Sequence, residues 1–406
     1  MSRLNWQNRH RIFFLVSIFI ANLKIICLAI SCLLVFTADV RAEKSKVFWG
    51  GLGFSTFGDS SQTPSAEALR NCAAEDSLDR CGGHDIFEMS RDIFVSSQFD
   101  HLEVEARMLP FDQQIGNILS PTISSEFVIK GKVDGKFFYT FLVTGSLMIY
   151  EVEANKTNFI SSVPFGIQTD EYFSKPLSKQ EELDYFKNWY VSQDPKVNFF
   201  VLMADYARSK IDVPFSFSNG IQFTNIDFSD SVKDVLTRTN SLQNWAKSIK
   251  SFSETRLAAR SGQPIIPSSA DGSQLKLVFQ DGSREIILRK PAYEFELYVA
   301  VFELQKPNAE WTCFNVGTFF TIRSAFEDEP ILDVPIVHGE DGCANLPADG
   351  IDETMFFPAN LFEQIDSVMK AFGSPNPDTK YVRARALEDA AGALSAIKKF
   401  RKEAYE

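Results

Sequence analysis

The sequence has few of the residues and motifs on which catalysis and metal binding commonly depend. Only 4 of its 406 residues are histidine, which leaves few general bases and few imidazole ligands. It contains no G-x-S-x-G elbow, no H-E-x-x-H pair and no Walker sequence. None of the four cysteines beyond residue 42 stands in the C-x-x-C spacing typical of zinc sites. These absences favour a non-enzymatic protein.

Positive charge is also scarce beyond residue 42. Residues 1–42 carry five Lys or Arg and one Asp, so the rest of the chain holds 36 basic and 52 acidic side chains, a net charge of −16. Such a chain repels nucleic acid, which we therefore do not expect as a partner. Basic residues gather only in two predicted helices, and we expect both groups to be solvated helix faces. They are Lys247, Lys250, Arg256 and Arg260, and Lys398, Lys399, Arg401 and Lys402.

Long apolar runs are confined to the N-terminus. Positive charges at Arg3, Arg9, Arg11 and Lys24 precede an apolar run over residues 25–36, and a short segment ending at Ala42 follows. This order predicts a signal peptide over residues 1–42, cleaved after Ala42. We therefore expect export to the periplasm, the cell envelope or the medium.

An uncleaved membrane anchor over residues 12–36 is the alternative. It would place Asn22 and Lys24 near the centre of the bilayer, where a lysine costs about 2.5–3.5 kcal/mol. The membrane would then be contacted only through this segment, because no later run is apolar for long enough to span a bilayer.

The remaining cysteines agree with export. Cys72, Cys81, Cys313 and Cys343 form an even set, which in an exported chain indicates two disulfides. Three pairings are open. Pairing neighbours along the chain would keep each bridge within one predicted domain.

Strand and helix patterns alternate without the regular order of a parallel α/β protein. They predict an α+β fold with two domains, 43–215 and 216–375, each a mainly antiparallel sheet with packed helices. Phenylalanine is abundant, at 38 residues, which indicates thick aromatic cores or aromatic faces that await a partner.

Several elements have clear local signals. Ser178 and Glu181 form a capping box that predicts the start of a helix, and Asp281-Gly282 predicts the turn of a hairpin over residues 275–288. The other expected helices cover 85–97, 241–260 and 361–372, with a further helix ending near 210. The expected strands are 46–54, 102–109, 126–133, 137–152, 158–167, 221–228, 293–304, 311–322 and 331–337.

The C-terminal tail, residues 376–406, reads as an amphipathic helix. Leu387, Leu394, Ile397 and Phe400 recur at helical spacing. We expect this apolar stripe to pack on the preceding domain, and the alternative is that it binds a partner. The stripe is too short for a coiled coil.

One group of side chains could hold a metal ion. His101, Glu103 and Glu105 alternate on one predicted strand, with His84 upstream. Imidazole and carboxylate groups on one strand face can converge on zinc, although alternating polar residues more often face solvent. No cofactor is predicted otherwise.

Two functions of different classes remain open. The first is an exported, non-enzymatic protein that binds, scaffolds or assembles protein partners in the cell envelope. The second is a metal-assisted hydrolase that uses the His101 strand. The shortage of catalytic residue types favours the first, and neither the partner nor the oligomeric state is predicted.

Overall fold

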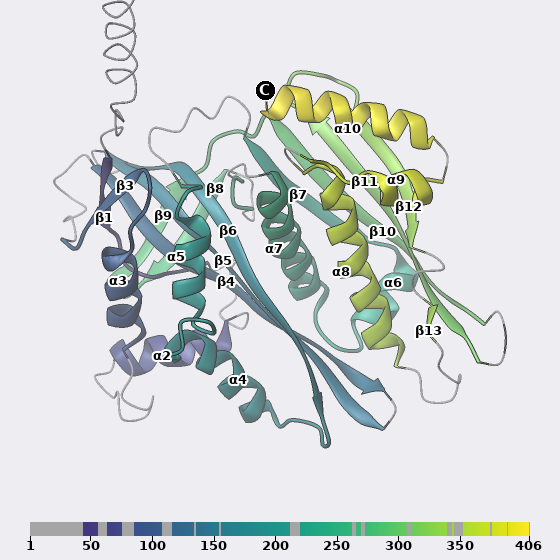
Figure 1. Ribbon diagram of the computed structural model, residues 1–406, viewed down its shortest axis with the longest axis horizontal. Coiled ribbons are helices and arrows are strands. Elements are labelled where there is room, and N and C mark those ends of the chain that lie inside the picture. The colour runs from purple at the N-terminus through teal and green to yellow at the C-terminus, as the bar shows by residue number, and fades with distance from the viewer. Residues whose placement is uncertain are drawn as a thin grey trace, which may run out of the picture. The chain divides into compact units, whose positions relative to one another are not determined.

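The computed structural model describes most of the chain from Lys44 onward and shows an α+β fold (Figure 1). The described residues are 44–55, 63–74, 85–107, 116–133, 135–153, 156–211, 220–261, 265–268, 273–306, 308, 310–338, 343–344, 352–373, 376–387 and 389–405. The predicted signal peptide lies outside them. Within these ranges, no helix has the length and the apolar character needed to cross a bilayer.

Three long antiparallel strands organise the first sheet. They are β4 (Gly116–Val133), β5 (Lys136–Glu153) and β6 (Lys156–Phe173). Their aromatic and β-branched residues predict this meander. The predicted strand begins only at residue 126 and leaves out Ser120, Pro121 and Ser125, whereas β4 begins at Gly116. In the structure Ser120 and Ser125 are buried, and β4 runs through all three.

Three shorter strands close this sheet into a barrel. They are β2 (Gly53–Ser55) and the hairpin β8 (Gln274–Phe279) and β9 (Gly282–Ile287). Strand β2 pairs with β4 in parallel and with β8 antiparallel, and β9 meets β6 in the parallel direction at one pair, Asn158 with Ile287. The closed order is β2-β8-β9-β6-β5-β4. Strands β1 (Ser45–Trp49) and β3 (Leu102–Glu105) extend it beside β4 by parallel pairing.

The second sheet contains the strands expected at 221–228, 293–304, 311–322 and 331–337. In spatial order they are β12 (Leu332–His338), β11 (Thr312–Ser324), β10 (Tyr293–Gln305) and β7 (Ile221–Phe228), with the short β13 (Cys343–Ala344) beside β11. The predicted bounds are confirmed to within two residues. Strands β10, β11 and β12 are antiparallel, but β7 and β10 are parallel.

The expected α+β class is therefore confirmed, but the expectation of mainly antiparallel sheets with packed helices is wrong. The first sheet is a six-stranded mixed barrel, and the second contains a parallel pair. The hairpin β8–β9 belongs to residues 216–375, yet its strands pair with β2 and β6 from residues 43–215. Strand propensity shows which residues are extended but not which strands become partners. The expected boundary near residue 215 lies outside the described residues.

Four helices cover one face of the long strands, as Figure 1 shows on the side away from α8. They are α2 (Pro64–Ala74), α3 (Ile86–Ser96), α4 (Lys179–Val191) and α5 (Phe199–Ala207). The capping box of α4 is confirmed, with Ser178 and Glu181 bonded to each other in both directions. Helix α2 was not predicted, although Pro64 occupies the first helical position that proline favours.

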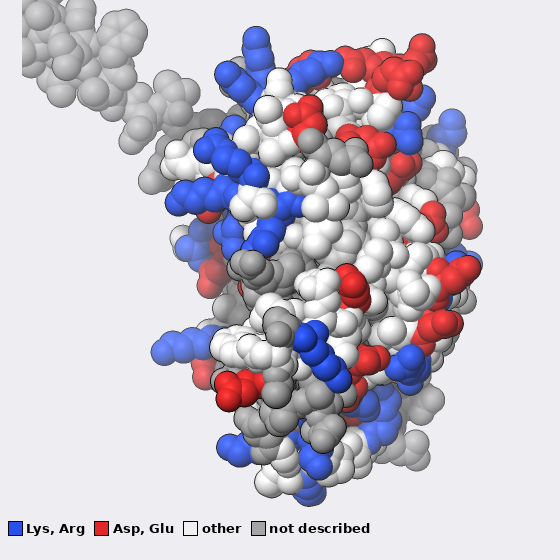
Figure 2. Space-filling view, turned by 90° about the vertical axis from the view of Figure 1, so that its right-hand side faces the viewer, with Lys and Arg blue, Asp and Glu red and all other residues white. Residues whose placement is uncertain are grey.

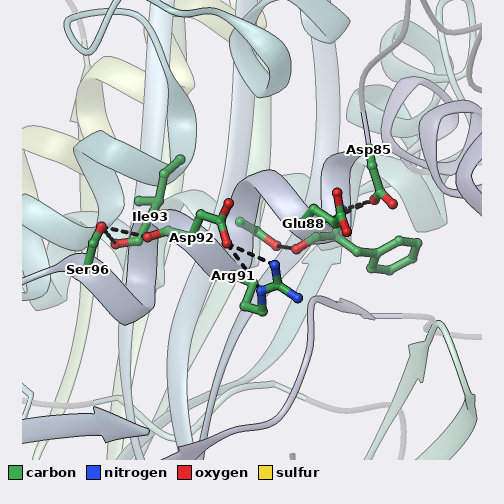
Figure 3. Close-up of polar contacts among 8 residues, drawn as sticks. Asp85, Glu88, Arg91, Asp92, Ile93 and Ser96 are labelled. Atoms are coloured by element: carbon green, nitrogen blue, oxygen red, sulfur yellow. Dashed lines mark hydrogen bonds and ion pairs between the residues drawn. The ribbon is translucent and has the colours of Figure 1, made fainter. Parts of the chain in front are cut away.

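Helix α3 shows how local contacts fix a helix end (Figure 3). The carboxylate of Asp85 accepts hydrogen bonds from the N–H groups of Phe87 and Glu88 at 2.8 and 3.2 Å. Further along, Arg91 pairs with Asp92 on the exposed side at 3.1 Å. The hydrogen bonds to Asp85 satisfy free backbone groups of the first turn. The predicted helix 85–97 is confirmed.

Two helices separate the two sheets. Helix α7 (Leu242–Ser261) and helix α8 (Glu353–Ala371) share one buried cluster with side chains from β4, β5, β10 and β11. Helix α6 (Asp230–Leu236) and the tail helices α9 (Lys380–Arg385) and α10 (Ala390–Tyr405) join the same cluster. Figure 1 shows α7 and α8 side by side between the long strands and the second sheet. Both faces of α7 are therefore covered.

Candidate functional site

The disulfide prediction is confirmed where the structure describes it. Cys313 on β11 and Cys343 on β13 are bonded and lie opposite each other in the strand register. Cys72 on α2 is also disulfide-bonded, and its expected partner Cys81 lies outside the described residues. The bridge ties the short strand β13 to the second sheet.

Of the predicted metal ligands, Glu103 and Glu105 lie on β3 and His101 immediately precedes it. His101 and Glu103 are exposed, and Glu105 forms an ion pair with Lys46 at 3.4 Å. His84 lies outside the described residues. In the part of the chain that the structure describes, no three His, Cys, Asp or Glu side chains group closely enough to hold a metal ion. The metal site stays a prediction from sequence.

The tail is not one helix as expected: it forms α9 and α10, Leu387 lies between them, and α10 packs on the second sheet. Ile397 and Phe400 are buried, Leu394 is half-buried, and Leu387 is 64% exposed. The ring of Phe400 lies 5.0 Å from the ring of Tyr293 and 5.3 Å from that of Phe295. Three of the four candidate partner-binding residues therefore serve the protein's own core or its edge in this conformation.

The basic residues of α7 do not form a solvated face, contrary to the expectation. Lys247 is buried with its ammonium group 3.4 Å from the carbonyl of Ser55, and Lys250 donates to the carbonyl of Thr224 at 2.5 Å. Arg256 and Arg260 both pair with Asp366 of α8. The sequence could not show this, because Lys and Arg side chains occur both on solvated faces and on buried faces where they find partners. The partners here are far from α7 along the chain.

A small polar chamber lies where α7 meets the barrel. Hydroxyl groups surround a cavity of about 20 Å³, which has room for about one water molecule. Glu254 lies at its edge and accepts hydrogen bonds from both the N–H and the hydroxyl of Ser268. Burial raises the pKa of Glu254 to about 7. The chamber is too small for a substrate, and its hydroxyl residues are Ser55, Thr122, Ser124, Thr144, Ser146, Ser162, Ser251 and Ser268.

A second carboxyl group, that of the half-buried Glu126 on β4, lies at the start of α2. It accepts hydrogen bonds from the N–H groups of Ser65 and Ala66 at 2.9 and 2.8 Å and from the hydroxyl of Tyr190 at 3.0 Å. Burial raises the pKa of Glu126 to about 7. Its contacts are those of a helix cap supplied by a neighbouring strand, so its position is explained by structure.

The face of the second sheet opposite α8 carries exposed aromatic residues. Tyr298 is 41% exposed and Phe319 is 39% exposed; they are cross-strand partners with ring centroids 6.2 Å apart. Pro335 is the partner of Phe319 on β12. An adjacent cross-strand row consists of Val301, Gly317 and Val337. We call these six residues the outer aromatic face.

A bulge in β10 brings the two rows together. The register shifts between Val299 and Val301, so Tyr298 and Val301 point to the same side although they are three residues apart. A Cβ atom added to Gly317 would lie 3.3 Å from the Cβ of Val301, which places that side chain directly over the glycine. The glycine therefore leaves the surface flat at this point.

Acidic side chains surround the outer aromatic face. Asp227 is the register partner of Tyr298 on β7, and Glu296 and Asp333 belong to the next cross-strand row. Exposed Glu303 lies on the other side. Two positive charges lie beside them: Arg323 pairs with Glu296 at 3.3 Å, and Lys233 of α6 pairs with Asp230 at 2.9 Å and interacts electrostatically with Asp227 and Tyr298. In the side view of Figure 2, Asp and Glu gather along the right-hand margin, while Lys and Arg gather at the upper left.

Sequence reasoning missed this surface, although it contains a signal. Glu294 and Glu296 alternate with buried Tyr293, Phe295 and Leu297, and the next outward position holds Tyr298 instead of a polar residue. An aromatic residue at a solvent-facing position of an alternating strand indicates contact with another molecule.

No family model, no curated protein and no solved structure matches this chain.

Proposed function

We propose that the chain is an exported, non-enzymatic protein of the cell envelope that binds a protein partner through the outer aromatic face. The observation that carries the proposal is the pair of exposed rings, Tyr298 and Phe319, at the centre of a sheet face. Large apolar side chains at adjacent exposed positions are typical of a surface that a partner covers.

The anatomy of this surface fits a docking site. It has an apolar centre of two cross-strand rows and a charged rim formed by Asp227, Glu296, Glu303 and Asp333. Protein interfaces have the same division into an aromatic-rich centre and a polar edge. The rim predicts a partner with an apolar contact surface bordered by Lys and Arg. Its association should slow as salt concentration rises.

Export is supported by the disulfide between Cys313 and Cys343, since disulfides persist in oxidising compartments. The predicted signal peptide agrees with it. We therefore expect the partner to be a protein outside the cytoplasm.

The test places a photo-crosslinking amino acid at Tyr298, Phe319 or Phe326 in the native host. Phe326 is a matched control, because it is 78% exposed in the turn between β11 and β12 and lies outside the two rows. We expect positions 298 and 319 to cross-link to the same protein and position 326 not to.

A second variant connects cross-linking with the apolar surface. Val301→Asp leaves both cross-linking positions in place but puts a charge in the adjacent cross-strand row, so the cross-link from position 319 should disappear. Circular dichroism of this variant checks that the fold is retained. Equal cross-linking from positions 319 and 326, or none from 298 and 319, would contradict the proposal.

A further inference from the structure

A cavity of about 320 Å³ lies where the first sheet meets α7 and α8. Its floor is apolar and comes from both sides of this junction: Ile129 and Leu142 from the sheet, Phe252 from α7 and Phe362 from α8. All four side chains are buried, and the rings of Phe252 and Phe362 meet edge to face at 4.6 Å. The volume lies near the lower end of the range of roughly 300–1,000 Å³ for small-molecule sites.

The rim of the cavity carries charge of both signs, but only part of it is neutralised within the protein. Asp366 pairs with Arg256, Arg260 and Lys370 at 3.6, 3.2 and 3.1 Å. Arg256 also lies over the ring of Phe252 at 4.7 Å. Among the described residues that line the cavity, Arg256 is the one cation, and it is held by Asp366 and the ring of Phe252.

Two carboxylates on the rim have no such neutralisation. Asp170 on β6 accepts a hydrogen bond from the hydroxyl of Thr140 at 2.6 Å, and Glu363 projects from α8. Within the described ranges neither forms an ion pair with Lys, Arg or His. An apolar floor beneath two free carboxylates selects a ligand with an apolar body and a positive group.

We propose that this cavity binds a small organic cation with an aromatic or aliphatic body and a primary amine. The body packs on Phe252, Phe362 and Leu142, and the ammonium group lies against Asp170 and Glu363. An anion is disfavoured at the same place by the two free carboxylates. This site is separate from the outer aromatic face, because the cavity is lined by β4, β5, β6, α7 and α8.

The experiment uses isothermal titration calorimetry of the purified protein with 2-phenylethylamine at neutral pH. The neutral 2-phenylethanol and the anionic 3-phenylpropanoate have a similar body and a different charge. We expect saturable binding of the amine, binding of the alcohol weaker by about tenfold, and no binding of the anion. No saturable binding of the amine, or equal binding of all three compounds, would overturn the proposal.

Two variants locate the binding. Asp170→Asn keeps the acceptor for the Thr140 hydroxyl but removes the charge, so it should weaken amine binding by about tenfold. Asp184→Asn is the matched control, because Asp184 accepts from the side-chain amide of Gln180 at 2.8 Å on α4, away from the cavity. It should leave the affinity unchanged. An equal loss in both variants would contradict the site.

A third variant tests the apolar floor without changing charge. Ala359 lines the cavity from α8 and is half-buried, so Ala359→Phe should fill the space and abolish binding of both the amine and the alcohol. Thermal unfolding checks that this variant is folded. Undiminished binding in a folded Ala359→Phe protein would place the ligand elsewhere.

Discussion

Glu126 and Glu254 are carboxyl groups that folding removes from water, and burial raises the pKa of each to about 7. Their surroundings differ. The N–H groups at the start of α2 bind Glu126, whereas Ser268 alone supplies both hydrogen bonds to Glu254. At the residue scale, the protein therefore holds two groups whose protonation depends on folding.

This dependence predicts how stability changes with pH. The pKa of Glu254 rises from 4.5 to about 7 on folding, so the folded protein keeps a proton that the unfolded chain releases in this interval. The stabilisation is complete below the unfolded pKa and is lost as pH rises through the folded one, by about 3 kcal/mol. Glu254→Gln removes this contribution and keeps an acceptor for Ser268. Its free energy of unfolding should decline less with pH than that of the wild type.

Urea unfolding at a series of pH values measures the difference. Glu285 is exposed on β9, and Glu285→Gln serves as the control that should keep the wild-type pH dependence. If Glu254→Gln and the wild type lose stability in parallel as pH rises, Glu254 is not protonated in the folded state.

At the element scale, the predictions succeeded where a signal is local. The box of Ser178 and Glu181 starts α4 as expected. The predicted hairpin is also present, but its turn consists of Gln280 and Asp281, and Gly282 begins β9 with a φ of 133°. Helix α2 and the first half of β4 were missed, because their small polar residues resemble those of loops. The basic residues of α7 were expected to face solvent, because the groups that bind them lie on elements far away in the sequence.

The tail helix α10 gives a prediction at this scale. Phe400 is fully buried and touches rings of Tyr293, Phe295 and Phe372, so Phe400→Ala should lower the free energy of unfolding by about 3–5 kcal/mol. Leu387→Ala is the control, because this exposed side chain should contribute within about 0.5 kcal/mol. Equal urea midpoints for the two variants would show that α10 is not part of the core.

At the scale of the whole molecule, the sequence predicts the α+β class correctly but not the topology. Charge, cysteine content and the N-terminal pattern concern the chain as a whole, and the export that they indicate stays a prediction. Barrel closure depends on pairings such as that of Asn158 with Ile287. A local sequence pattern does not predict a pairing between residues so far apart in the chain. The candidate surfaces were missed for the same reason, since Tyr298 and Phe319, or Asp170 and Phe252, come together only in the folded chain.

The predicted export has a direct test on the intact molecule. The protein recovered from its native host should have the mass of a chain that begins at Glu43. Reduction should raise that mass by about four units, because two disulfides gain two hydrogens each. A species that retains residues 1–42 would support the membrane anchor, and an unchanged mass on reduction would contradict the oxidising compartment.

The closure of the barrel by β8 and β9 has a consequence for biosynthesis. Strands β2 and β6 leave the ribosome more than a hundred residues before the hairpin that completes their pairing. During that interval their edges have free backbone groups, which can pair with other nascent chains. Contacts of such high contact order also form slowly. Translocation of an extended chain, with folding delayed until its last third has arrived, would keep these edges apart until their partners exist.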